Sequence, residues 1–132
     1  MIAQPTPMAP ERARELGPLQ LAYVGDTVWD MLVRVDLLRR GLNVHHMHRE
    51  AVGRVNAGAQ AASFRRLRPH LTEAEEGVAL RGRNAHPHHA VPRNQDPRDY
   101  ADATGLESLM GYLYLTGQER RIDELFAIAQ EE

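Results

Sequence analysis

The stretch from Pro18 to Arg40 is apolar on two sides, which constrains the fold more than any other feature of the sequence. At about 3.6 residues per turn, one apolar row consists of Leu21, Val24, Val28, Met31, Leu32, Val35 and Leu38. A second row consists of Ala22, Trp29, Val33 and Leu37. Proline suits the first turn of a helix, and Gly41 suits the position after its last turn. We therefore predict a central helix with neighbours on both sides.

Asp26 interrupts the second apolar row, where helical spacing predicts another apolar residue. A carboxylate at that position is expected to be partly desolvated, which is costly unless a cation compensates it. Glu107 is a second acid of this kind, beside an apolar stripe, with Gly111 one turn further along for a close helix neighbour. Two facing carboxylates would suit Mg²⁺ or Mn²⁺. Pairing with arginines such as Arg34 or Arg54 is the alternative, and the spacing leaves both open.

The rest of the chain shows helical periodicity and no alternating strand pattern, so the predicted class is all-α. The predicted helices cover residues 9–16, 18–40, 43 through 60 or beyond, 73–81, 100–115 and 119–130. Thr72 and Glu75 form a capping box before the fourth of them, and Gly117 ends the fifth. Residues 81–97 hold three prolines and are predicted to be a binding loop.

Length and composition narrow the class of protein. A chain of 132 residues is long enough for one core and too short for two ordinary domains. It has no cysteine, which excludes disulfides and thiolate metal sites. No run approaches the ~20 apolar residues that a membrane-spanning helix needs, and the N-terminus lacks a signal pattern. We therefore expect a soluble, cytoplasmic protein with no membrane partner.

The charge pattern permits a basic surface on a protein that is nearly neutral overall. The net charge is −2, and all 16 basic residues are arginine. Arg81-Gly82-Arg83-Asn84 suits phosphate recognition, because guanidinium groups contact phosphate oxygens in pairs and glycine lets the backbone approach. The alternative is a helix end with two solvated arginines. The loop histidines His86, His88 and His89 have no acidic or thiol neighbours there, so phosphate or ribose contacts fit them better than zinc.

Four segments together resemble a known family. Leu21-Ala22-Tyr23-Val24-Gly25-Asp26-Thr27-Val28 is similar to the signature of the ribonuclease III catalytic domain, and more closely to its variant in the Mini-ribonuclease III family. Residues 81–85, 91–100 and 103–115 are similar to three further segments of that family, in the same order and spacing. The resemblance covers about residues 16–128.

This resemblance implies an all-helical, homodimeric domain at residues 16–132, after a lead-in at 1–15. It implies an Mg²⁺-dependent endoribonuclease, with Mn²⁺ as a substitute, that cuts double-stranded RNA during maturation of large-subunit (23S-type) ribosomal RNA. A ribosomal protein is a candidate partner that presents the substrate. The expected products carry 5′-phosphate and 3′-hydroxyl ends. We expect no separate double-stranded-RNA-binding domain in a chain of this length.

The resemblance also implies roles for individual residues. Asp26 and Glu107 match the catalytic acids and metal ligands, and Thr104 is expected to orient a water on the metal. Predicted RNA contacts are Arg81, Gly82, Arg83, Asn84, His86 and Arg93. Ala22 and Thr104 stand where the broader ribonuclease III pattern has carboxylates, which leaves fewer ligands for a second metal. A catalytically silent module that binds RNA or assists ribosome assembly is the alternative function, and the presence of both acids counts against it.

Overall fold

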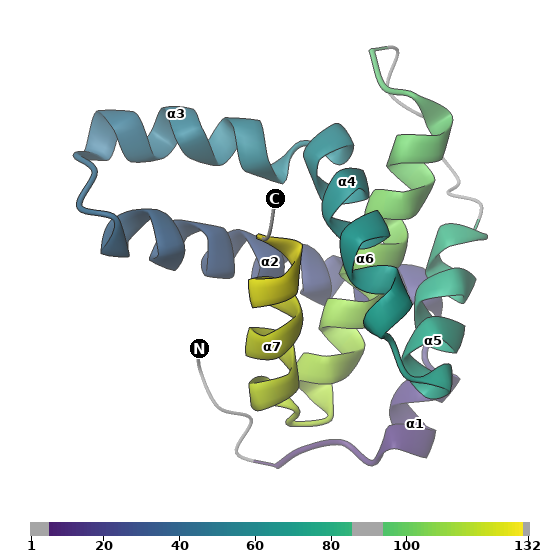
Figure 1. The fold of residues 1–132 in the computed structure, drawn as a ribbon. Coiled ribbons are helices and arrows are strands. Elements are labelled where there is room, and N and C mark those ends of the chain that lie inside the picture. The colour runs from purple at the N-terminus through teal and green to yellow at the C-terminus, as the bar shows by residue number, and fades with distance from the viewer. Residues whose placement is uncertain (1–5, 86–93, 131–132) are drawn as a thin grey trace.

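The computed structural model describes residues 6–85 and 94–130. Its helices are α1 (Pro10–Glu15), α2 (Pro18–Arg39), α3 (Val44–Val55), α4 (Ala57–Leu67), α5 (Glu73–Arg83), α6 (Pro97–Leu115) and α7 (Glu119–Ala129), with a 3₁₀ turn at Arg68–His70. These residues contain no strand, which confirms the predicted all-α class (Figure 1). Within the same residues, no helix combines the length and the hydropathy required to cross a bilayer.

Helix α6 occupies the centre, and α2, α4, α5 and α7 pack around it (Figure 1). Its sequence explains this position, because apolar or small residues cover most of its circumference from Ala103 to Leu113. Leu106, Leu109, Met110 and Leu113 are completely buried there. Trp29 of α2 and Phe64 of α4 fill the core beside them. The helix with all-round burial is therefore α6 rather than α2.

The second half of α2 leaves the body and runs alongside α3, and these two segments form a projecting arm (Figure 1). The prediction that Val35 and Leu38 face the core is wrong, because no helix of the described residues covers their side of α2: Leu38 is 62% exposed, whereas Leu37 beside it is 2% exposed. The second row, Ala22, Trp29, Val33 and Leu37, is buried throughout. Helical spacing identified both rows, but the helices that pack against α2 decide which of them is covered.

Two predicted helix boundaries change in ways that bear on the site. The single helix predicted over 43–60 is divided at Asn56, whose side chain accepts a hydrogen bond from the backbone N–H of Ala59 at 2.9 Å and so caps α4. Helix α5 continues to Arg83, so Arg81 to Arg83 form its last turn rather than the start of a loop. The first change begins a new helix, α4, after Asn56, and the second gives Arg81 to Arg83 a helical backbone.

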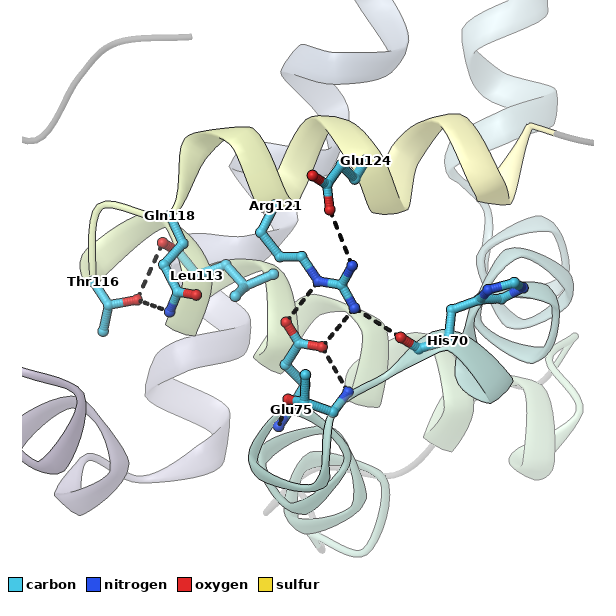
Figure 2. Close-up of polar contacts among 8 residues, drawn as sticks. His70, Glu75, Leu113, Thr116, Gln118, Arg121 and Glu124 are labelled. Atoms are coloured by element: carbon cyan, nitrogen blue, oxygen red, sulfur yellow. Dashed lines mark hydrogen bonds and ion pairs between the residues drawn. The ribbon is translucent and has the colours of Figure 1, made fainter.

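A buried ion pair between Arg121 and Glu75 joins α7 to α5 (Figure 2). The Arg121 guanidinium donates to both carboxylate oxygens of Glu75 at 2.9 Å and to the His70 carbonyl oxygen at 2.7 Å. Glu75 also closes the predicted capping box by accepting from the Thr72 N–H at 2.8 Å. Burial alone would raise the pKa of Glu75, but the hydrogen bonds from Arg121 and Thr72 lower it instead.

Candidate active site

Helices α2 and α6 cross with their backbones in contact, and this crossing creates the site. A Cβ atom at position 111 would lie 1.9 Å from the carbonyl oxygen of Leu21, so only glycine fits there. The expected close approach of a helix at Gly111 is therefore confirmed. The same crossing places Asp26 of α2 against Glu107 of α6, because each acid lies within one turn of a glycine at the crossing.

The two carboxyl groups interact directly. Burial raises the pKa of Glu107 to about 8, and a hydrogen bond with Asp26 and its negative charge add to the effect. Asp26 itself is exposed, so the expectation that this acid is desolvated is wrong. Glu107, which lies deeper in the cleft, carries the desolvation instead. At neutral pH, Glu107 therefore keeps its proton, and its carboxyl group carries no charge that would repel Asp26.

The arginines that offered an alternative partner are engaged elsewhere. Arg34 pairs with Asp30 at 3.1 Å, and Arg54 pairs with Asp36 at 2.8 Å. No arginine of the described residues forms an ion pair with Asp26 or Glu107. Arg34 and Arg54 are therefore not the partners of these acids, and binding of a divalent cation to the pair stays a prediction.

The two carboxyl groups suit a hard divalent cation, but they would supply only part of its coordination shell. Carboxylate oxygens are the ligands that Mg²⁺ and Mn²⁺ prefer. Within the part of the chain that the structure describes, no third histidine or acid joins the pair to make a cluster of three possible ligands. The rest of a Mg²⁺ coordination shell would consist of water and substrate oxygens, as is usual for this ion in phosphoryl chemistry.

The acids lie in a cleft of about 960 Å³ between α2, α4, α6 and the end of α5. Tyr23 stands at its edge and is 84% exposed. Thr104 also lines the cleft, and its hydroxyl donates to the carbonyl oxygen of Tyr100 at 3.0 Å. The hydroxyl oxygen keeps its lone pairs, so the predicted role of Thr104 in orienting a water stays a prediction.

The predicted RNA contacts divide into three groups. Arg83 and Asn84 line the cleft with the acids. Arg81 points to another side, where it donates to the carbonyl oxygen of Arg14 at 2.8 Å, and Gly82 is packed against Ser108 of α6. His86 and Arg93 lie outside the described residues. Only Arg83 and Asn84 are therefore brought together with Asp26 and Glu107 in the described part of the chain.

Gln60 of α4 is a polar residue of the cleft that sequence reasoning missed. It is buried, with 4% of its surface exposed, and lines the same cleft as the acids. The signal that identified Asp26 was present here too, because Gln60 lies on the buried side of α4 with Phe64 and Leu67. A polar residue in an apolar row marks such positions in both helices.

Comparisons with known proteins agree with this geometry. The family model of the ribonuclease III domain matches residues 19–118, which include Asp26, Glu107 and all four resembling segments. The Mini-ribonuclease 3 of Symbiobacterium thermophilum is 49% identical over 117 residues, which cover 88% of this chain and 89% of that protein. The Mini-ribonuclease 3 of Desulfitobacterium hafniense is 43% identical over 114 residues, covering 86% and 71% respectively. A crystal structure of a Fusobacterium nucleatum protein superposes with a TM-score of 0.79 at 28% identity and covers 87% of this chain and 92% of its own.

Proposed function

The chain belongs to the Mini-ribonuclease III family of ribonuclease III domains, and on this basis we propose that it is a metal-dependent endoribonuclease that cleaves double-stranded RNA. The observation that carries the proposal is the pair Asp26 and Glu107. The two acids share one cleft, interact with each other and have no arginine partner among the described residues. Such a pair is unfavourable for folding alone and useful for holding a cation.

Asp26 and Glu107 would hold Mg²⁺, with Mn²⁺ as a substitute. When bound, the ion supplies Lewis-acid chemistry: it activates water and stabilises charge on the phosphate. Glu107 must lose its proton to act as a ligand, so cation binding should release a proton at neutral pH. Asp26 contributes the second negative charge from the exposed side of the cleft.

The remaining cleft residues position the RNA. The Arg83 guanidinium can contact a phosphate through two parallel hydrogen bonds, and Asn84 beside it supplies a neutral donor. In the reaction, the oxygen of a water molecule bonds to phosphorus, and the bond from phosphorus to the 3′-oxygen breaks. The products are a 5′-phosphate and a 3′-hydroxyl: one proton of the water ends on the 3′-oxygen, and the other is released to solvent.

The functional unit in this proposal is a homodimer. A second copy would cover large apolar side chains that are exposed in the single chain. On the cleft side these are Leu19 and Tyr23, and on the arm they are Leu38, Val44 and Val52. A two-fold axis would present two clefts to one duplex, so that both strands are cut across the minor groove. The substrate is then recognised by its A-form shape and backbone more than by its sequence. A precursor of large-subunit (23S-type) ribosomal RNA, presented by a ribosomal protein, is the proposed physiological substrate.

The test compares purified wild-type protein with Asp26→Asn and Glu107→Gln on duplex RNA, with Mg²⁺ and with a chelator. We expect the wild type to cut only with the metal and to leave 5′-phosphate ends, and both variants to lose at least about a hundredfold in rate while still binding RNA. Asp30→Asn is the matched control, since it makes the same change on the same helix at a residue paired with Arg34 outside the cleft.

Binding of RNA by the wild type without cleavage would refute the enzyme and support the silent module. The absence of any salt-sensitive RNA binding would refute an RNA role altogether. Sedimentation tests the dimer separately. We expect the wild type to be a dimer and Leu38→Glu to shift towards the monomer, and a monomeric wild type would contradict the dimer.

A further inference from the structure

Gln60 is a buried polar residue that lines the same cleft as the acid pair. Among the described residues, the buried polar or charged side chains are those of Gln60, Ser63, Glu75 and Ser108. Glu75 pairs with Arg121, and the Ser108 hydroxyl donates to the Pro18 carbonyl oxygen at 2.9 Å. The Gln60 side chain has no hydrogen bond to any residue that the structure describes, although its backbone is bonded within α4.

The carboxamide of Gln60 remains open to the cleft. Within the described residues, Trp29 Nε1 is the side-chain donor that is both sealed from solvent and without a partner. The oxygen and nitrogen of Gln60 are not sealed in this way, and Gln60 lines the cleft with Asp26, Thr104 and Glu107. Since Gln60 lines this cleft and is otherwise buried, its polar end is accessible from the space that the acids share.

Folding alone does not account for a glutamine here. The carboxamide has no hydrogen bond to the described residues, so it contributes nothing to the fold that an apolar side chain of similar size, such as leucine, would not supply. A group that enters the cleft from outside would satisfy the amide. The carboxamide both donates and accepts hydrogen bonds and is neutral, so it adds no charge to a site that already holds two carboxylates.

We propose that Gln60 is a substrate-contacting residue whose carboxamide hydrogen-bonds the sugar–phosphate backbone of RNA beside Asp26 and Glu107. The inference rests on the proposed ribonuclease function. A ribose 2′-hydroxyl matches both halves of the carboxamide, since it donates and accepts, whereas a phosphate oxygen engages only the NH₂ group. The 2′-hydroxyl and the phosphate oxygen belong to the same backbone, and 2′-deoxy substrates distinguish between them.

The test uses Gln60→Leu, with Gln60→Met as a second apolar side chain of similar size. We expect kcat/KM on duplex RNA to fall at least about tenfold in both variants, while the melting temperature stays equal to that of the wild type or rises. Ser63→Ala is the matched control, because Ser63 is a buried polar residue of the same helix that lines a separate hollow. Its kcat/KM should stay within about twofold of the wild type.

Three outcomes decide the proposal. Wild-type kcat/KM in both Gln60 variants overturns it, even if cleavage by the wild type and its loss in Asp26→Asn uphold the nuclease. A drop in melting temperature that parallels the loss of activity in both variants also overturns it, because Gln60 then acts through folding. Reduced kcat/KM at unchanged or higher melting temperature supports it.

Substrates with single 2′-deoxy nucleotides near the cut identify the atom. If Gln60 contacts a 2′-hydroxyl, one such substitution slows the wild type by about the same factor as Gln60→Leu and has no further effect in that variant. If the contact is to a phosphate oxygen, each substitution affects the wild type and Gln60→Leu equally. A failure of the wild type to cleave any duplex refutes the underlying nuclease instead.

Discussion

A Cβ atom on Gly25 would lie 1.6 Å from the backbone carbonyl oxygen of Glu107. No side chain fits into that distance, so α2 and α6 approach as closely as two helix backbones can. Asp26 follows Gly25 directly in the sequence and is therefore held against Glu107. The glycine has no chemistry of its own, but it determines how far apart the two acids lie.

Replacing Gly25 by alanine should destabilise the protein and separate the acids. The new methyl group meets backbone atoms of α6, which cannot rotate away, so we expect a loss of about 2–4 kcal/mol in the free energy of unfolding. Urea denaturation followed by circular dichroism measures it. Gly77→Ala in α5 is the control, because its Cβ would meet nothing within 4 Å. That change should stabilise by about 0.5–1 kcal/mol. Equal effects of the two substitutions would contradict the close crossing.

Glu107 should make the metal-free protein less stable as the pH rises. Its pKa increases from the ordinary value of 4.5 to about 8 on folding, so between these values the folded state keeps a proton that the unfolded state has lost. Stability from this group is complete below about pH 4.5 and is lost as the pH rises through about 8. Glu107→Gln should remove the dependence and raise stability at pH 8 by on the order of 1–3 kcal/mol.

Thermal unfolding of both proteins in a chelator, at pH 5 and at pH 8, measures this effect. Mg²⁺ should restore stability to the wild type at pH 8 and leave Glu107→Gln almost unchanged, because the ion binds the folded acids. A wild type whose stability rises from pH 5 to pH 8 as much as that of Glu107→Gln would contradict the raised pKa.

The ion pair of Arg121 and Glu75 should make the protein more stable as the pH rises, which is opposite to the effect of Glu107. The lowered pKa of Glu75 means that its stabilising contribution is present above about pH 4.5 and is lost as the pH falls through the folded value. Arg121→Met leaves a buried carboxylate without its partner and should cost about 3–5 kcal/mol at pH 7, measured by urea denaturation. Adding Glu75→Gln should recover much of this loss. Arg120→Ala, at an exposed neighbour, should change stability by less than about 0.5 kcal/mol.

Arg83 should contribute more to RNA affinity than Arg81. Arg83 lines the cleft, whereas the Arg81 guanidinium donates to the Arg14 carbonyl oxygen on another side. We expect Arg83→Ala to weaken binding of duplex RNA several-fold and to reduce the slope of log affinity against log salt by about 1. Arg81→Ala should leave that slope unchanged. Filter binding in Ca²⁺ at several salt concentrations measures both, and a larger effect of Arg81→Ala would reverse this assignment.

The sequence alone determined the helical class, most helix ends and the two acids. These features are local: apolar spacing depends on the helix repeat, capping depends on residues three apart, and Asp26 is conspicuous within its own helix. Gly111 also indicated that another helix comes close to Glu107. The end of α6 follows from Gly117 and the bounds of α7 from its periodicity, whereas α6 begins at Pro97 rather than at the predicted residue 100.

Only the tertiary structure decided which faces of these helices are covered. Val35 and Leu38 match the apolar spacing as well as Val28 does, yet they are exposed on the arm, where no other described helix covers their side of α2. Likewise, packing around the crossing of α2 and α6 leaves Asp26 exposed and desolvates Glu107. Burial and pKa depend on residues far away in the chain that pack opposite a side chain, and the periodicity of a single helix contains no information about them.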